Sequence, residues 1–222
     1  MIDKVCIPLY NGTIFLYEGT ELCADGQYFI TNYFNYKMEV KILITWNTEL
    51  HTERLHMRKM KVSDSPSLFK IWSDPDVTEF MNVSSFTEES QAKDLIKLLD
   101  ELSQDNKAIR YSIIDKVSNE IIGSCGFNYL DFEHAKAEIG YDIAKTSWGR
   151  GYATEAIQSL LDYGFSTLEL NRIEAKVEPE NVNSAKVLRK LNFSFEGTLR
   201  QYEKINGVFN DLTMYSKLRS DA

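Results

Sequence analysis

Residues 147–156 read Ser147-Trp148-Gly149-Arg150-Gly151-Tyr152-Ala153-Thr154-Glu155-Ala156, and they lie between two segments of different periodicity. Before them, residues 137–144 alternate apolar and polar side chains, which is typical of a half-buried strand. After them, apolar side chains recur at the spacing of a helix, at Ala153, Ala156, Ile157, Leu160, Leu161 and Phe165. The two glycines are therefore predicted to lie where a strand turns into a helix.

A turn of this kind is a candidate site for an anion. The first turn of a helix has backbone N–H groups without intrahelical partners, and it lies at the positive end of the helix dipole. Gly149 and Gly151 have no side chains, so a phosphate group can approach the main chain closely, and Arg150 adds a fixed positive charge. Two glycines can also merely shape a tight turn, and the downstream segments decide between these interpretations.

The composition predicts a globular protein of one domain with an appendage, since the chain has 222 residues. No apolar run approaches the roughly 20 residues that span a bilayer, and the first residues are too polar for a signal peptide. Only Cys6, Cys23 and Cys125 carry thiols, which indicates a reducing compartment. A net charge of −8 argues against general nucleic-acid binding and permits a cationic substrate. We therefore expect a cytoplasmic protein without a membrane or nucleic-acid partner, and homo-oligomerisation stays open.

Residues 1–50 differ from the rest and are predicted to form a β-rich N-terminal extension. Apolar and polar residues alternate over Met38–Trp46, and Asn11-Gly12 is a strong hairpin turn. Residues 51–222 are predicted to form the main domain. Its expected elements are a strand near 54–58, helices that begin at 63 and at a capping box over 85–88, strands at 108–115, 120–127 and 137–144, a helix after 152, a strand at 172–177, a helix at 183–191 and a hairpin at 194–204 and 208–218. Three consecutive strands with short connections predict an antiparallel meander.

Four segments together resemble the GNAT acetyltransferases. They are Trp148–Ala156, Leu170–Ala175, Asn181–Ser184 and Leu191–Arg200, in the order and at the spacing of that superfamily. From about residue 52 onward the chain looks like the branch of bacterial Rim-type ribosomal-protein N-terminal acetyltransferases. The resemblance implies an α+β GNAT fold with a mixed, mostly antiparallel sheet flanked by helices. It also implies an enzyme that transfers an acetyl group from acetyl-CoA directly to a primary amine, without a metal. A protein or peptide N-terminus is favoured as the acceptor, because an α-amine is easier to deprotonate than a lysine or polyamine amine. Small amines, polyamines and aminoglycosides stay open as acceptors.

The resemblance also implies where acetyl-CoA binds. The family's pyrophosphate loop corresponds to the glycine turn, and Trp148 departs from the family pattern at the first position of that motif. The implied pyrophosphate contacts are Gly149, Arg150, Gly151, Tyr152, Ala153 and Thr154, mainly through their backbone N–H groups. The pantetheine arm would pair with the backbone of the preceding strand at Tyr141, Ile143 and Ala144. In the family the next strand diverges from this one, and the cofactor occupies the gap.

The catalytic residues follow from the same resemblance. Many GNAT enzymes protonate the departing thiolate with a helix tyrosine, but this chain has Leu188 at that position. The Rim-type branch has Asn-x-x-Ser instead, which implies Asn181 as a cofactor contact and Ser184 as the general acid. The same branch has Gln-x-Glu in the hairpin, which implies Glu203 as the general base. Structural interpretations stay open: Ser184 as a helix cap, Asn181 as a turn residue and Glu203 as a solvated carboxylate.

Two other functions also stay open. Gly149-x-Gly151-x-x-Thr154 after a strand imitates a dinucleotide-binding motif, with Glu174 or Glu178 near the distance expected for a ribose contact. The antiparallel strands and the terminal hairpin argue against that fold. An acyl-CoA-binding sensor or scaffold without turnover would fit the missing helix tyrosine. Ser184 and Glu203 argue against the sensor.

The remaining candidate side chains have simple structural interpretations. His51, His56 and His134 do not show the spacing of a metal site, so we expect surface histidines. Cys125 lies in an apolar strand, which predicts a buried and unreactive thiol.

Overall fold

The computed structural model describes residues 20–22, 28–30, 46–81, 83–205 and 207–221. The chain divides into two compact units, Met1–Leu43 and Ile44–Ala222. In the first unit, β1 (Thr20–Leu22) pairs antiparallel with β2 (Tyr28–Ile30). The hairpin turn predicted at Asn11-Gly12 and nearly all of the strand predicted at Met38–Trp46 lie outside the described residues.

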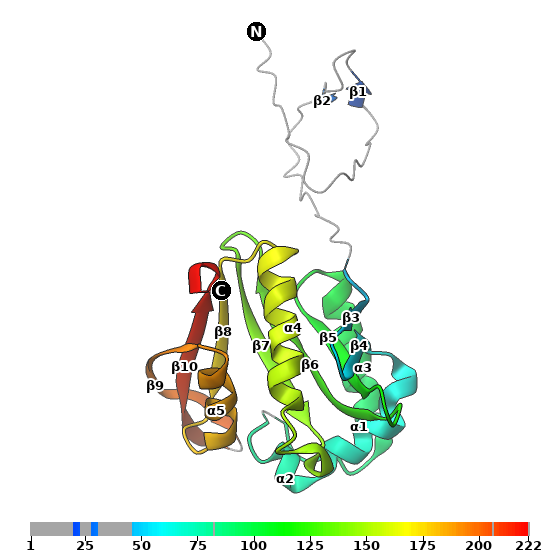
Figure 1. Cartoon of the computed structure of the whole chain (residues 1–222), viewed down its shortest axis with the longest axis vertical. Helices are drawn as coiled ribbons and strands as arrows, with labels where there is room; N and C mark the ends of the chain where they lie inside the picture. Colours follow the sequence, from blue (N-terminus) through cyan, green and yellow to red (C-terminus); the bar gives the residue numbers. More distant parts are fainter. Residues whose placement is uncertain (1–19, 23–27, 31–45, 82, 206, 222) are drawn as a thin grey trace. The chain divides into compact units, whose positions relative to one another are not determined.

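The second unit is built on an eight-stranded sheet with the strand order β3-β4-β5-β6-β7-β8-β10-β9 (Figure 1). Its elements are β3 (Glu49–His51), β4 (Leu55–Lys59), α1 (Ser65–Trp72), α2 (Pro75–Thr78), α3 (Glu89–Gln104), β5 (Ile109–Asp115), β6 (Ile121–Asp131), β7 (Lys136–Ile143), α4 (Tyr152–Ser166), β8 (Arg172–Val177), α5 (Val182–Lys190), β9 (Ser194–Ile205) and β10 (Val208–Leu218). Neighbouring strands are antiparallel except for β7 and β8, which are parallel. The predicted α+β fold with a mixed, mostly antiparallel sheet is confirmed.

The main sheet begins with β3, before the boundary predicted at residue 51. β3 pairs with β4 through Glu49–Arg58, Leu50–Met57 and His51–His56, and the Leu50 side chain is buried in the core. A division between residues 50 and 51 would cut through this strand. The two units therefore divide at Ile44 instead.

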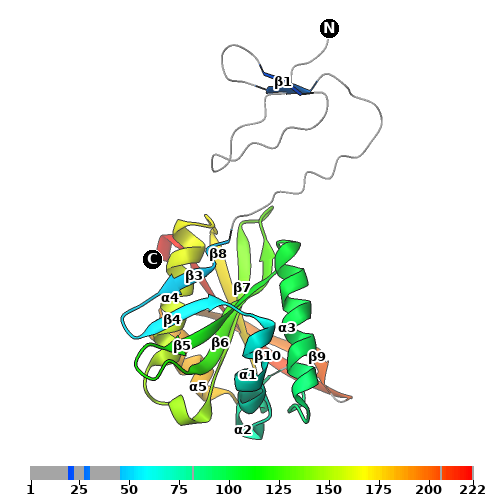
Figure 2. The same cartoon turned by 90° about the vertical axis from the view of Figure 1, so that its right-hand side faces the viewer.

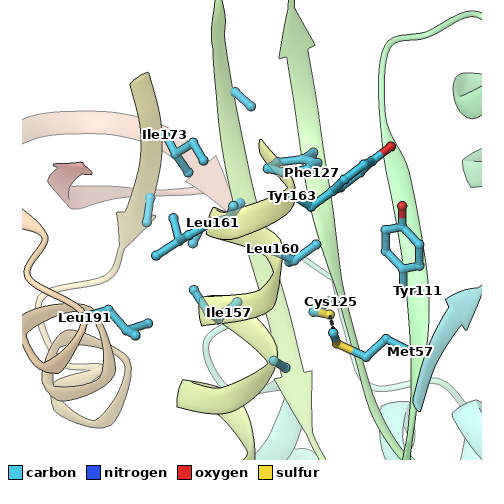
Figure 3. Close-up of a cluster of buried hydrophobic side chains, with 14 of the residues drawn as sticks. Met57, Tyr111, Cys125, Phe127, Ile157, Leu160, Leu161, Tyr163, Ile173 and Leu191 are labelled. Carbon is cyan, nitrogen blue, oxygen red and sulfur yellow. Dashed lines mark hydrogen bonds between the residues drawn. The ribbon is translucent and has the colours of Figure 1, made fainter. Parts of the chain in front are cut away.

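Helices cover both faces of the sheet (Figure 2). Helix α4 packs on one face against β4, β6 and β7, whereas α1 and α3 pack on the opposite face against β6 and β5. The core under α4 includes Met57, Tyr111, Cys125, Phe127, Ile157, Leu160, Leu161, Tyr163, Ile173 and Leu191 (Figure 3). These residues alternate along the strands and recur every three or four positions on α4, so each element buries one face. Among the described helices, none is long and apolar enough to cross a membrane.

Cys125 is fully buried in this core, as predicted. Its thiol lies 3.6 Å from the sulfur of Met57. Burial raises the pKa of the Cys125 thiol to about 12, so the reactive thiolate is scarce at neutral pH.

Helix α3 begins later than the sequence predicts. Its N-cap is Glu88, whose backbone N–H donates to the side-chain oxygen of Gln91 at 3.0 Å. The capping box predicted to start at Ser85 is wrong, because the Ser85 hydroxyl lies 2.6 Å from the hydroxyl of Thr78 instead. A serine three residues before a glutamate does not by itself start a helix, because the serine side chain can form a hydrogen bond with another group instead.

A buried ion pair fastens the start of α1 to β4. The Arg58 guanidinium donates two hydrogen bonds to Asp64, at 2.8 and 2.7 Å. The Ser112 hydroxyl and the Lys61 backbone N–H donate to the same carboxylate, at 2.7 and 3.0 Å. Burial acts to raise the pKa of Asp64, but these hydrogen bonds and the charge of Arg58 outweigh it and hold that pKa below its ordinary value.

We expect Asp64→Asn to lower the free energy of unfolding by about 3 kcal/mol at pH 7, because Arg58 would lose its buried partner. The pKa of Asp64 is lower in the folded chain, so its contribution is present above the unfolded pKa of about 3.9 and is lost as pH falls through the folded pKa. The difference in the free energy of unfolding between wild type and variant should therefore become smaller below about pH 4. Urea denaturation at pH 7 and pH 3 measures it, with the exposed Asp94→Asn as control. An equal difference at both pH values would contradict this account.

Candidate functional site

Strands β7 and β8 separate toward their carboxyl ends. They pair only at Lys136–Arg172, Ala137–Ile173 and Glu138–Glu174, although β7 continues to Ile143 and β8 to Val177. Because the two strands are parallel, both carboxyl ends lie at the same end of the sheet. The unpaired part of β7 therefore borders an opening in the sheet at that end, as the resemblance to the family implies.

Alternation along β7 determines which backbone groups border the opening. The Ala144 N–H donates to the Ile122 carbonyl at 2.8 Å, so it is directed to β6. Neighbouring residues of a strand direct their backbone groups to opposite edges, so the N–H groups of Tyr141 and Ile143 are directed to the opening. The Ile143 carbonyl accepts a hydrogen bond from the Trp148 indole at 2.7 Å. Ala144 contributes no backbone group, because its carbonyl also accepts from Ser147 at 2.8 Å.

The glycine turn follows β7 and lies at the same end of the sheet. Gly149 and Gly151 have φ angles of +73° and +80°, a region that favours glycine. A Cβ atom on Gly149 would meet nothing within 4 Å, so the main chain is open to a ligand there. The first intrahelical bond of α4 runs from the Glu155 N–H to the Gly151 carbonyl at 3.1 Å. The preceding N–H groups, at Tyr152, Ala153 and Thr154, therefore have no intrahelical acceptor, and with the exposed Arg150 they are groups of the kind that can bind an anion.

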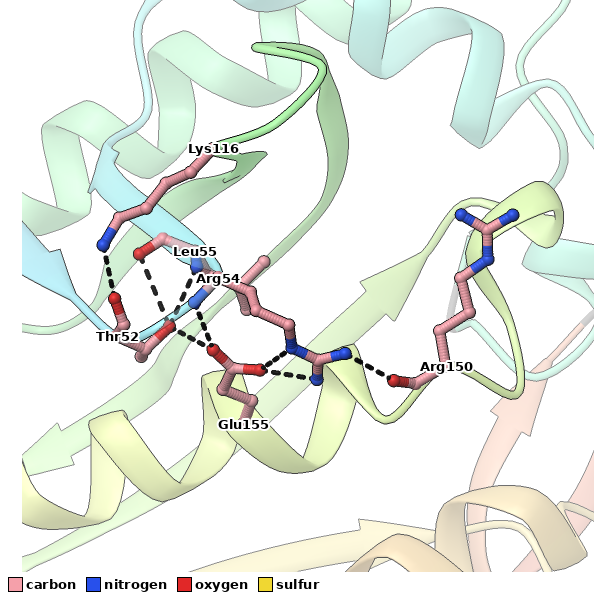
Figure 4. A network of polar contacts seen from close by, with 6 residues as sticks. All are labelled: Thr52, Arg54, Leu55, Lys116, Arg150 and Glu155. Carbon is pink, nitrogen blue, oxygen red and sulfur yellow. Dashed lines mark hydrogen bonds and ion pairs between the residues drawn. The ribbon is translucent and has the colours of Figure 1, made fainter.

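Arg54, from the segment just before β4, holds this turn against the sheet (Figure 4). Two nitrogens of its guanidinium, Nε and Nη2, each lie 2.6 Å from Oε2 of Glu155. The third nitrogen, Nη1, donates a hydrogen bond to the Arg150 carbonyl at 2.9 Å. The Thr52 hydroxyl donates to the other oxygen of Glu155 at 2.5 Å. Burial acts to raise the pKa of Glu155, but the hydrogen bonds from Thr52 and Arg54 lower it below its ordinary value. Arg54 also lies over the Tyr152 ring, 4.6 Å from its centre.

Helix α5 brings Ser184 to Tyr141. The Ser184 hydroxyl lies 2.6 Å from the Tyr141 hydroxyl. Burial raises the pKa of Tyr141 to about 12, although the hydrogen bond to Ser184 acts in the opposite direction. Leu188, at the position of the family tyrosine, is fully buried in the core. A phenol on β7 therefore lies beside Ser184, a contact that the sequence alone does not predict.

The N-cap of α5 is Asn181 and not Ser184. The Asn181 side-chain oxygen accepts a hydrogen bond from the Ser184 backbone N–H at 3.0 Å. The interpretation of Ser184 as the helix cap is therefore wrong. The Ser184 hydroxyl contacts Tyr141 instead, and the Asn181 side-chain oxygen caps the helix.

The β9–β10 hairpin extends past the end of β8. Val177, the last residue of β8, pairs with Thr213, whereas Glu203 pairs with Asn210, closer to the hairpin turn. Glu203 therefore lies beyond the carboxyl end of β8, at the end of the sheet where β7 and β8 separate. Burial raises the pKa of Glu178, and the negative charges of Glu203, Glu180 and Glu79 raise it further. Several carboxylates thus gather near this end of β8.

Comparison with known proteins identifies the family. A model of the acetyltransferase (GNAT) domain matches residues 54–194. An uncharacterized N-acetyltransferase, p20, of Bacillus licheniformis is 52% identical over 172 residues, which are 78% of this chain and 97% of the relative. The chain belongs to the GNAT family, and it is an acetyl-CoA-dependent N-acetyltransferase.

Solved structures have the same fold. The ribosomal-protein-S5-alanine acetyltransferase of Vibrio fischeri superposes with a TM-score of 0.69 at 28% identity, over 79% of this chain and 98% of that one. RimL, a ribosomal L7/L12 α-N-protein acetyltransferase solved with coenzyme A, has a TM-score of 0.72 at 22% identity, over 78% and 99%. The alternative of a dinucleotide-binding domain is contradicted, because the sheet has one parallel pair among antiparallel strands.

Proposed function

We propose that this enzyme acetylates the α-amine of a protein or peptide N-terminus, with Glu203 as general base and Ser184 as general acid. The observation that carries the proposal is the opening beside β7. It is bordered by the glycine turn, by the Tyr141–Ser184 pair and by the carboxylates near the end of β8. A protein α-amine is also the acceptor in the name of the RimL structure.

The residues of the opening fit acetyl-CoA. The turn from Gly149 to Thr154 offers backbone N–H groups and open space to a pyrophosphate, and Arg150 adds positive charge. The N–H groups of Tyr141 and Ile143 are directed to the opening, where they suit the amide and thioester oxygens of a pantetheine arm. We assign the thioester oxygen to one of these two N–H groups, as an oxyanion-hole donor. Ala144 is not part of this assignment, because both of its backbone groups are hydrogen-bonded within the protein.

Acid and base act on opposite sides of the transfer. Glu203 accepts a proton from the amine, directly or through a water, as nitrogen attacks the thioester carbon. Ser184 donates a proton to the departing sulfur as the carbon–sulfur bond breaks. The Tyr141 phenol, with its raised pKa, keeps its own proton at neutral pH and holds the Ser184 hydroxyl through the 2.6 Å contact.

The acceptor class follows from the cost of deprotonation. An α-amine with a pKa of about 7.8 needs only about 1 kcal/mol to lose its proton at pH 7, whereas a lysine amine near 10.4 needs about 4 to 5 kcal/mol. A single hairpin carboxylate is better suited to the smaller cost. The carboxylates near β8 also attract an amine in its cationic form before it is deprotonated.

A matched pair of peptides tests the proposal. One peptide has a free α-amine and no lysine, and the other has the same sequence with an acetylated N-terminus and one added lysine. Release of free thiol from acetyl-CoA should be at least tenfold faster, as kcat/KM, with the first peptide at pH 7. Equal rates, or a preference for the lysine peptide, would contradict the α-amine assignment. Binding of acetyl-CoA without thiol release from any amine would support a sensor instead.

The glycine turn can be tested separately. We expect Gly151→Val to raise the KM for acetyl-CoA at least tenfold, or about 1.4 kcal/mol, because a branched side chain would stand where a phosphate must approach. The positive φ of Gly151 adds a loss of stability of about 1–2 kcal/mol. Gly197→Val is the matched control, since Gly197 also has a positive φ and lies on β9. It should lose stability with an unchanged KM. An unaltered KM in a folded Gly151→Val protein would mean that the phosphates of acetyl-CoA do not bind at this turn.

A further inference from the structure

We propose that Glu49, His51 and His56 form a binding site for a transition metal of the Zn²⁺ class. Glu49 and His51 lie on the same side of β3, two residues apart, and His56 is the cross-strand partner of His51 on β4. The three side chains can each place one ligand atom within 4.8 Å of the others. The spacing in sequence does not show this, because the pairing of β3 with β4 brings the two histidines together.

Two of the three ligand separations match those of a coordination tetrahedron. Nε2 of His51 and Nε2 of His56 each lie 3.4 Å from Oε2 of Glu49. Metal–ligand bonds of about 2.0–2.2 Å at tetrahedral angles put neighbouring ligand atoms about 3.4 Å apart. Two imidazole nitrogens with one carboxylate oxygen are donors that suit Zn²⁺, Co²⁺, Ni²⁺ or Cu²⁺, whereas Ca²⁺ and Mg²⁺ favour oxygen ligands. Three protein ligands leave a fourth position for water.

The surroundings leave these three groups free to bind a metal. Nε2 of His56 is buried and makes no hydrogen bond within the described part of the chain. Arg58, which faces Glu49 across the hairpin, directs its guanidinium to Asp64 at 2.7 and 2.8 Å. Glu49 and His51 are exposed, so a metal can reach them from solvent. A buried nitrogen without a hydrogen bond is the kind of group that ligation would satisfy.

Binding would require a local change in the two rings. They stack with their centres 4.6 Å apart and an angle of 9° between their planes, so the lone pairs of the two nitrogens lie in nearly parallel planes. Each ring must tilt about its Cβ–Cγ bond until the lone pairs converge. His51 is exposed, so its ring has room for this rotation.

A bound metal would link β3 to β4 directly. β3 is a three-residue strand at the edge of the sheet, and such a short edge strand is held by few hydrogen bonds. The turn between His51 and His56 contains Thr52 and Arg54, which bind Glu155 beside the glycine turn. We therefore expect the metal to stabilise the fold at this edge.

The test is calorimetric titration of Zn²⁺ into the full chain, treated with a chelator and free of any affinity tag. A Cys6→Ser, Cys23→Ser background removes the two thiols of the N-terminal unit, which would compete for zinc. We expect one equivalent of Zn²⁺ to bind, and His51→Ala or Glu49→Gln to weaken binding at least tenfold. His134→Ala is the matched control, because His134 is an exposed histidine beside Asp131 on another part of the surface.

Two further readouts separate the site from adventitious binding. Zn²⁺ should raise the Tm of the background protein and leave that of His51→Ala unchanged, and bound Co²⁺ should show the visible absorption of a tetrahedral ion. No binding, equal binding by His51→Ala, or a loss of binding in His134→Ala would each overturn the proposal. His51 is exposed, so its removal leaves the core intact.

Discussion

Glu203→Gln is expected to lower kcat by about 10²- to 10⁴-fold at pH 7, the range that general-base assistance typically contributes. The substitution keeps the size of the side chain and removes its ability to accept the amine proton. Part of the loss should return as pH rises, because a growing fraction of the acceptor amine is then already neutral. Steady-state kinetics with saturating acetyl-CoA and a free α-amine peptide, from pH 6.5 to 9, measures both effects.

The neighbouring carboxylates provide the controls. Glu180→Gln changes the charge by the same amount at an exposed position whose charge also acts on Glu178, so it separates a field effect from base catalysis. It should change kcat by less than tenfold. Near-normal kcat in Glu203→Gln at pH 7 would mean that the base is elsewhere, and Glu178, with its raised pKa, is then the next residue to test. Glu138 is a weaker candidate, because its carboxylate is paired with Lys176 at 2.7 Å.

Local periodicity was sufficient to predict most elements of the second unit. Each element buries one face, so the spacing of its apolar residues contains the information. The strand over Arg172–Val177 and the closing hairpin lie where alternation and Asn206-Gly207 predict them. β6 continues to Asp131, although its predicted end is Phe127. The prediction stops there because a bulge between Phe127 and Tyr129 breaks the alternation of apolar and polar residues.

The contacts that shape the site could not be predicted in this way. Arg54 and Glu155 are 101 residues apart, and Tyr141 and Ser184 are 43 apart, so their meeting depends on how the strands and helices pack. The alternation of backbone groups along β7 shows that Ala144 does not face the opening, but only once the pairing of that strand with β6 is known. The resemblance to a family identified the segment around Ser184, but the choice between Asn181 and Ser184 as the helix cap required the start of α5.

The same limit applies to the histidines. His51 and His56 are five positions apart, a spacing that fits neither one face of a helix nor one face of a strand. Their side chains lie side by side because a short turn places the two residues opposite each other on β3 and β4. A search for metal sites along the sequence therefore passes over pairs that a hairpin brings together.

The Tyr141–Ser184 pair predicts a second large effect on turnover. We expect Ser184→Ala to lower kcat about tenfold to a hundredfold, because a thiolate is a tolerable leaving group and needs less help than the amine. Tyr141→Phe should have an effect in the same range, since it removes the hydroxyl that lies 2.6 Å from Ser184. The double variant should be no slower than the slower single variant, because both changes remove one unit. In contrast to Glu203→Gln, high pH should not restore the rate of either variant.

Asn181→Ala distinguishes this chemistry from helix capping. It removes the cap of α5 and leaves the Ser184 hydroxyl in place, so it should lower the free energy of unfolding by about 1 kcal/mol. Ser184→Ala keeps the backbone N–H that Asn181 accepts, so its Tm should stay close to that of wild type. Melting temperatures and kcat are therefore measured on all four variants. A Ser184→Ala protein that loses stability but keeps its kcat would assign Ser184 to the packing of α5 and leave the departing sulfur to another donor.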